Sequence, residues 1–575
     1  MGPAAPDPRT NRNTIDDEVI VRSDELRPNV LLIIMDDLAW GDLGCHGNPQ
    51  TNTPHLDRLH SESTRLTRYC SGPVCTPARA ALMTGRYPYR TRAIDTYLGR
   101  SCLDPGEITL PARLRDAGYR TCISGKWHLG DCYPMRAIDM GFDEALVHNG
   151  GGLAQPANLG RDDYFDPDLM HNGKLTPTEG YCTDVFADHA IRFITDHRDE
   201  PWFCYLATNA PHSPMQVDDA WARPHLDAGL PEVWARLYGM VDNIDHNVGR
   251  VLQTLSRLEL DEETIVIYTS DHGPCGSARA EGETRFNAGL RDIKGSVYQG
   301  GLNVPHFWRW PGRLTPGRDV AYTANPIDLL PTLAEPCRFT PPNDRPIDGI
   351  NLWPLMTGDV EPAAMPDRHV FIQWHRGDEP VRYRNAAAIG RRHKWVRRRE
   401  DQPDELFDLD TDPGESDNLA DTKPETVQTF RAAYDAWFDD VSNTRPDNYA
   451  PPRIIVGSDH ENPVTLTRQD WRLYPGSPEA WETRAPGYWP ITVERSGRFR
   501  VRLSAPCVGG AATLRFRCGD VERELPLRPG WSPLVKAWLY DLTLPEGDHD
   551  LEAYWTPDGA EKAMGVWNVE LRRLD

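Results

Sequence analysis

The chain has 575 residues, 39% of them hydrophobic and 26% charged; this composition excludes wholesale disorder, and the length indicates two or three domains. Its 63 basic and 86 acidic residues give a formal net charge of −23, which disfavours nucleic acid as a partner, because that binding requires cationic side chains opposite the phosphates. The longest strongly apolar run, residues 30–35, is far shorter than the ~20 residues that cross a bilayer, so neither a transmembrane helix nor a membrane partner is expected.

The N-terminal residues 1–27 are polar and lack the apolar core of a signal peptide. We therefore expect a flexible arm and a cytoplasmic protein, or a periplasmic or secreted one if an export signal has been removed. The 12 cysteines include no C-x-x-C pair and are expected to be reduced and mostly buried.

Four apolar segments predict the centre of a parallel β-sheet: residues 29–35, 119–124, 202–208 and 264–270. They lack polar alternation, which is typical of strands covered by helices on both faces. Amphipathic spacing predicts helices at 183–196 and 231–258. Charged or imidazole side chains follow each strand, and in open α/β sheets functional groups gather at these carboxyl ends.

The pattern changes after residue 365, where short strands are predicted at 369–374, 386–396 and 405–409, followed by a helix at 424–440. Beyond residue 450, runs that alternate polar and apolar residues predict an antiparallel β-sandwich of about 100 residues. We therefore divide the chain into an arm (1–27), an α/β domain (28–365), a small subdomain of antiparallel sheet plus helix (366–448) and an accessory β-sandwich (449–575).

The sharpest local feature is the pentapeptide that runs from Cys75 to Arg79, C-T-P-A-R, which is followed by Gly85. Proline suits the first turn of a helix and glycine the position just after its end, so a helix is predicted to begin near Cys75. Free N–H groups at such a terminus attract anions, and Arg79 would lie one turn further along.

This pentapeptide resembles the maturation signature of the type I sulfatases of the alkaline phosphatase superfamily, in which the cysteine is oxidised to formylglycine and the aldehyde hydrate is the nucleophile. Five further segments match that family's motifs in the same order, within a resemblance that spans residues 28–420. They are Asp36-Asp37, residues 125–130 (G-K-W-H-L-G), residues 210–212 (A-P-H), residues 271–273 (D-H-G, with Asp271 and His272) and the lysine loop at 294–301. The resemblance implies a large mixed, mostly parallel sheet sandwiched by helices, with a small C-terminal α+β subdomain, to which the antiparallel sandwich is added.

The resemblance also assigns the site residues. It implies one divalent cation, Ca²⁺, held by Asp36, Asp37, Asp271 and His272, and a catalytic set of Cys75, Arg79, Lys126, His128, His212 and Lys294. The family more often has asparagine where this chain has His272, and imidazole is a softer ligand than Ca²⁺ prefers. His272 is therefore left open as a weak ligand, a ligand of another metal or a neighbour of the ligands. Four further residues are left open between pocket and packing roles: Asn287, Arg291, Trp374 and His375.

The resemblance predicts a sulfuric ester hydrolase that acts on a sulfated saccharide and on aryl sulfates, and that requires a formylglycine-generating or equivalent maturation enzyme as a partner. The saccharide preference also draws on the tryptophans of the predicted sandwich: Trp531, Trp538, Trp555 and Trp567. Two alternatives remain, a phosphonate or phosphate ester hydrolase of the same superfamily and a non-catalytic sugar-binding protein. The sequence gives no indication of the oligomeric state.

Overall fold

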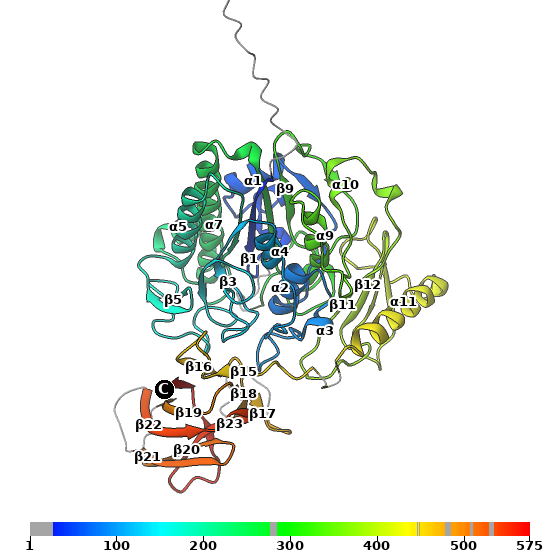
Figure 1. The fold of residues 1–575 in the computed structure, drawn as a ribbon. Helices are drawn as coiled ribbons and strands as arrows, with labels where there is room; N and C mark the ends of the chain where they lie inside the picture. The colour runs from blue at the N-terminus through cyan, green and yellow to red at the C-terminus, as the bar shows by residue number, and fades with distance from the viewer. Residues whose placement is uncertain are drawn as a thin grey trace, which may run out of the picture.

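The computed structural model describes residues 27–276, 285–445, 447, 449–477, 485–506, 510–527 and 534–575 (Figure 1). The predicted N-terminal arm, apart from its last residue, lies outside the described residues, as does Trp531. Among the described helices, none combines the length and apolar character that a membrane span requires.

A ten-stranded mixed sheet forms the centre of the protein, in the order β10-β2-β9-β8-β1-β7-β3-β4-β5-β6. Its five middle strands, from β8 to β4, pair in parallel, while β9, β5 and β6 run antiparallel to their neighbours. Four of the middle strands are the four that the apolar runs predicted. The bounds are β1 (Asn29–Met35), β2 (Thr64–Leu66), β3 (Arg120–Lys126), β4 (Glu144–His148), β5 (Asp168–His171), β6 (Lys174–Pro177), β7 (Trp202–Ala207), β8 (Thr264–Ser270), β9 (His306–Arg309) and β10 (Asp319–Val320).

Helices cover both faces of this sheet, which is why β1, β7 and β8 are buried along their whole length (Figure 1). Successive side chains of a strand point to opposite faces, so in β1 Leu32 joins one buried cluster and Ile33 the other. One face packs against α1 (Pro54–Ser61), α5 (Cys182–Asp196) and α7 (Glu232–Arg257), and the other against α2 (Cys75–Thr84), α4 (Leu110–Asp116) and α9 (Leu329–Ala334). The α/β domain also contains α3 (Pro88–Thr91), α6 (Asp219–Asp227), α8 (Gln299–Leu302) and α10 (Trp353–Thr357).

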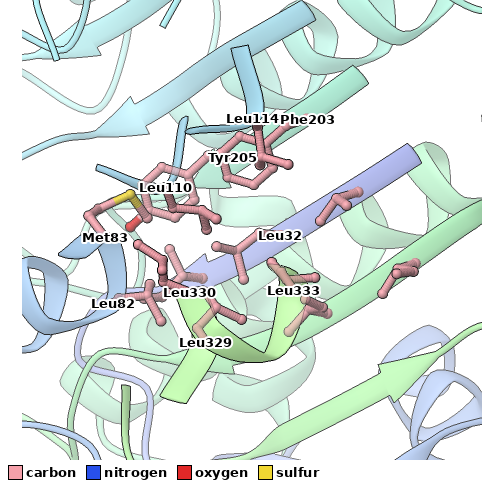
Figure 2. Close-up of a cluster of buried hydrophobic side chains, with 14 of the residues drawn as sticks. Leu32, Leu82, Met83, Leu110, Leu114, Phe203, Tyr205, Leu329, Leu330 and Leu333 are labelled. Atoms are coloured by element: carbon pink, nitrogen blue, oxygen red, sulfur yellow. The ribbon is translucent and has the colours of Figure 1, made fainter. Parts of the chain in front are cut away.

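Buried side chains hold α2 against the sheet. Figure 2 shows Leu82 and Met83 of α2 in one cluster with Leu32 of β1 and Tyr205 of β7, beside leucines of α4 and α9. Burial of each such side chain contributes about 1.5–3 kcal/mol. The helix that begins at Cys75 is therefore firmly fixed to the two central strands.

A second, four-stranded antiparallel sheet follows, made of β11 (Val370–Gln373), β12 (Ala386–Ile389), β13 (His393–Arg397) and β14 (Glu405–Asp408), with α11 (Pro424–Ser442) packed on it. The single strand predicted at 386–396 is wrong, because the chain reverses at Gly390 and makes a hairpin of β12 and β13. The sequence carries a signal for this turn, because Gly390 is followed by the charged residues Arg391 and Arg392.

The C-terminal residues form two further sheets that share one apolar core. One has the order β15-β18-β23-β20-β21, with β17 and β24 at its margins, and the other the order β16-β25-β19-β22; β15 and β18 pair in parallel and the other pairs are antiparallel. The core also takes in side chains from the large domain: Tyr97, Leu98, Cys102, Cys132 and Met135. The strand bounds are β15 (Ile454–Val456), β16 (Val464–Thr467), β17 (Arg472–Leu473), β18 (Gly487–Val493), β19 (Gly497–Pro506), β20 (Ala512–Cys518), β21 (Val521–Leu527), β22 (Leu534–Leu544), β23 (Gly547–Pro557), β24 (Met564–Gly565) and β25 (Asn568–Arg573).

This architecture confirms the predicted fold class of a mixed sheet between helices with a small subdomain and an added β-sandwich. The domain boundaries given above stay predictions. Of the tryptophans considered for sugar binding, Trp555 belongs to the sandwich core, whereas Trp538 is 37% exposed and stacks with Tyr540.

Candidate active site

The ten predicted site residues form one continuous network at the carboxyl ends of the central strands. Asp36 and Asp37 follow β1, Asp271 and His272 follow β8, and Lys126 is the last residue of β3. Helix α2 supplies two more residues, and loops after β3, after β7 and before α8 supply the rest: Cys75, Arg79, His128, His212 and Lys294. Nearly all of these side chains are buried, so their charges act on one another with little solvent screening.

Three cationic side chains compensate the three carboxylates. Lys126 Nζ lies 2.6 Å from Asp36 Oδ2 and Lys294 Nζ lies 2.6 Å from Asp37 Oδ1. Arg79 donates from Nε and Nη2 to Asp271 Oδ2 at 3.0 and 2.9 Å. Although burial alone would raise the pKa of the Asp37 carboxyl, the charges of Lys294, His212 and His272 hold it well below its usual value.

Cys75 is the first residue of α2 and lies at the centre of this network. Its Sγ is 3.6 Å from Asp36 Oδ1 and 3.1 Å from His272 Nε2. Burial acts to raise the pKa of the thiol, but the positive charges of Lys126, Lys294 and His272 outweigh it and hold the pKa well below the usual value. The position therefore favours a negatively charged group or a bound anion.

The carboxylates fit a divalent cation. Asp36, Cys75, Asp271 and His272 each offer a ligand atom within 4.8 Å of the others, and carboxylate oxygens suit a hard cation. Among the described residues, the buried Asp37 Oδ2 has no hydrogen-bond partner, so one oxygen remains available for such an ion. His272 Nε2 faces the cluster, 3.4 Å from Asp271 Oδ1 and 3.9 Å from Asp36 Oδ1.

Two imidazoles border the network. Burial and the charge of Lys126 lower the pKa of His128, and the Cys75 thiol, which lies beside the ring, opposes this effect. His128 Nε2 donates to the Thr96 carbonyl at 2.9 Å, so Nδ1 carries the lone pair; we assign this tautomer from the hydrogen bond. His212 Nε2 lies 3.7 Å from Asp37 Oδ2, and its Nδ1 contacts the Ser213 carbonyl at 2.8 Å.

Two glycines at the site were missed by the sequence reasoning. A Cβ atom on Gly151 would lie 2.8 Å from His128 Cε1, and one on Gly152 would lie 3.1 Å from His212 Nδ1. The backbone of this loop thus packs directly on both imidazoles. Three consecutive glycines, residues 150–152, were the available signal.

Of the four residues left open, Trp374 reaches the site: a Cβ on Gly295, next to Lys294, would lie 3.3 Å from its ring, and its Nε1 donates to Asp95 at 3.1 Å. The other three make local contacts. Arg291 donates to the Glu415 carbonyl, His375 contacts the Glu379 carbonyl, and Asn287 donates to carbonyls of its own loop.

Comparison with known proteins agrees with this geometry. The sulfatase family model matches residues 28–336, and the model of the C-terminal part of N-sulphoglucosamine sulphohydrolase matches residues 289–433. N-acetylgalactosamine-6-sulfatase of Canis lupus familiaris is 33% identical over 373 residues, 61% of this chain and 69% of that protein. Steryl-sulfatase of Mus musculus is 31% identical over 525 residues, 71% of this chain and 80% of that protein.

A solved structure shows the same fold. The crystal structure of Ps i-CgsB matches with a TM-score of 0.65 and 27% identity, over 72% of this chain and 92% of that one. The family model, the relatives and the fold all identify a sulfatase. The chain therefore belongs to the type I sulfatase family and is a sulfuric ester hydrolase.

Proposed function

We propose that this protein hydrolyses a sulfate ester of a sulfated saccharide, and also acts on aryl sulfates, by means of a formylglycine formed from Cys75 and a bound Ca²⁺. The observation that carries the proposal is the setting of Cys75 at the first position of α2, where its buried Sγ lies 3.1 Å from His272 Nε2 and the positive charges of Lys126 and Lys294 help to lower its pKa. A sulfate ester is an anion, and this position offers it both concentrated positive charge and the helix N-terminus.

In a covalent mechanism, the residues around position 75 would each have a separate role. One hydroxyl of the hydrated formylglycine attacks sulfur, while His212 and Lys294 hold the sulfate and one of them protonates the departing alkoxide. Arg79 and Lys126 steady the hydrate. The lone pair on His128 Nδ1 accepts the proton of the second hydroxyl, the aldehyde reforms, and sulfate leaves.

Asp36, Asp37 and Asp271 would hold the cation, with His272 beside them. When bound, such an ion acts as a Lewis acid toward a sulfate oxygen. The three cationic side chains that now pair with the carboxylates keep the site ordered and provide positive charge for the substrate.

Two similarities support a saccharide. One relative is named an N-acetylgalactosamine-6-sulfatase, and Ps i-CgsB, 26% identical to this chain, has been solved in complex with k-i-k-neocarrahexaose. The exposed pair of Trp538 and Tyr540 offers an aromatic surface on which a sugar ring can stack. The name of the steryl-sulfatase relative favours a steroid sulfate as the second candidate.

A panel of defined sulfated sugars, a steroid sulfate and matched aryl sulfate and aryl phosphate tests this proposal. We expect turnover of the aryl sulfate and of at least one sulfated sugar by protein co-produced with a formylglycine-generating enzyme. Faster hydrolysis of the aryl phosphate would favour the phosphoesterase alternative, and no turnover of any ester would favour the sugar-binding one.

A further inference from the structure

A loop of the C-terminal sandwich reaches the catalytic histidine of the large domain. Gln469, between β16 and β17, is only 3% exposed. Its Nε2 donates to the Thr96 carbonyl at 2.7 Å and to Ser101 Oγ at 2.9 Å, and it lies 3.4 Å from His128 Nε2. The sandwich therefore contributes a buried polar side chain to the edge of the active site.

The hydrogen bonds define how Gln469 acts on His128. The Thr96 carbonyl has two lone pairs and accepts from both Gln469 Nε2 and His128 Nε2. Both N–H groups of the Gln469 amide are used, one on Thr96 and one on Ser101. If the amide were flipped, the Gln469 side-chain oxygen would lie 2.7 Å from the Thr96 carbonyl oxygen, and two acceptors would face each other. We therefore assign the nitrogen of the amide to this position.

The carbonyl that orients His128 lies on an irregular segment that is held both by the rest of the catalytic part and by the sandwich; outside the sandwich, Asp95 accepts a hydrogen bond from Trp374 Nε1 at 3.1 Å and pairs with Arg100. Residues 92–102 contain no helix or strand, and Leu98 has a φ of +59°, which is rare for a residue other than glycine. The sandwich side supplies two more bonds to this segment: Gly99 N donates to the Gln469 carbonyl at 2.9 Å, and Arg472 donates to the Leu98 carbonyl at 2.9 Å. Tyr97, Leu98 and Cys102 complete the contact by joining the sandwich core.

We propose that the C-terminal sandwich completes the active site, with Gln469 as a positioning residue for His128. Gln469 fixes the Thr96 carbonyl, this carbonyl takes the Nε2 proton of His128, and the Nδ1 lone pair is thereby kept toward residue 75. The inference rests on the proposed function only in the role it gives to that lone pair. The C-terminal sandwich thus contributes to the chemical step through Gln469, in addition to any contribution it makes to substrate binding.

A double-mutant cycle on full-length protein tests this link. We would measure kcat and KM for an aryl sulfate in the wild type, Gln469→Ala, His128→Ala and the double variant. At metal sites, loss of the group that orients a ligand lowers activity about 10- to 100-fold. By analogy, we expect Gln469→Ala to lower kcat by a similar factor with little change in KM. In the His128→Ala background the same change should cause no further loss of the residual kcat, because the residue that Gln469 acts through is gone.

Two further variants separate positioning from folding. Gln469→Met keeps the length of the side chain but cannot donate, so we expect it to lose as much kcat as Gln469→Ala. Arg136→Met removes contacts to the sandwich at Glu461 and the His460 carbonyl without touching His128, so it should lower the melting temperature and retain kcat.

Additive effects in the cycle, full kcat in Gln469→Met or a loss of kcat in Arg136→Met equal to that of Gln469→Ala would each overturn the inference. The formylglycine content of every preparation is measured by mass spectrometry. Fully active protein that lacks formylglycine contradicts the proposed function, and the coupling between Gln469 and His128 then still decides the inference.

Discussion

Replacement of Asp271 with alanine removes one partner of a fully buried ion pair. The side chains of Arg79 and Asp271 are 1% and 0% exposed, and two guanidinium N–H groups donate to the same carboxylate oxygen. After the replacement, Arg79 keeps two acceptors among the described residues, the Lys126 carbonyl and the Tyr205 hydroxyl. Because loss of one partner leaves an uncompensated buried charge, we expect a destabilisation of about 3–5 kcal/mol.

A matched control separates burial from ion pairing as such. Arg399 and Asp401 form a pair of similar length, 2.7 Å, but their side chains are 63% and 69% exposed. Asp401→Ala should leave the melting temperature unchanged, because exposed pairs contribute little. Asp271→Asn, which retains an acceptor oxygen for Arg79, should fall between Asp271→Ala and the wild type.

The assay is thermal and denaturant unfolding of the three variants beside the wild type, with aryl sulfate turnover measured on the same samples. Asp271→Ala should be inactive as well as destabilised, since Asp271 is also a proposed cation ligand. If Asp271→Ala shifts the unfolding midpoint as little as Asp401→Ala does, the reasoning from burial is wrong.

Four further outcomes are expected. Cys75→Ala should fold and bind a sulfated ligand without turnover. Cys75→Ser, which has one hydroxyl, should become sulfated once and then stop, and mass spectrometry of the intact variant detects the sulfated adduct. Repeated turnover by either variant would contradict the mechanism. His272→Asn supplies an oxygen donor, so it should bind Ca²⁺ more tightly in a titration of chelator-treated protein if His272 is a ligand, and equal affinity would place His272 outside the ligand set. Gly151→Ala should lower kcat by displacing the His128 ring, whereas the control Gly510→Ala, whose Cβ meets no atom within 4 Å, should leave kcat unchanged. Equal kcat values in the two variants would show that the loop of residues 150–152 moves to accommodate the methyl group. Burial raises the pKa of Glu461 from 4.5 to about 7, so between these pH values the folded protein holds a proton that the unfolded chain releases. The free energy of unfolding should therefore fall as the pH rises from 4.5 to 7. Glu461→Gln should flatten this part of the profile of melting temperature against pH.

Local patterns were enough to predict the central strands and the site residues that follow them. The clearest case is β1, a continuous apolar run because helices cover both faces of the sheet, whose end is marked by the change from Met35 to Asp36. The predicted start of α2 at Cys75 also agrees with the structure, where Gly85 ends the helix with a φ of +71°.

Contacts between distant segments could not be predicted in this way. Gln469 lies 341 positions after His128, on a loop whose sequence carries no catalytic pattern, and its role depends on how the sandwich docks on residues 96–102. The orientation of His128 likewise depends on a backbone carbonyl, that of Thr96, which no side-chain motif records. The turn at Gly390 is a different case, since the glycine and the two arginines after it mark the turn in the sequence and the prediction of a single strand did not use that signal.

The central claim concerns the chemical state of residue 75, and mass spectrometry of the peptide that contains it is the most direct measurement. Protein produced with and without a formylglycine-generating enzyme should differ in the fraction of residue 75 present as formylglycine, and kcat for an aryl sulfate should be proportional to that fraction. Fully active protein in which residue 75 is entirely unmodified cysteine would contradict the account.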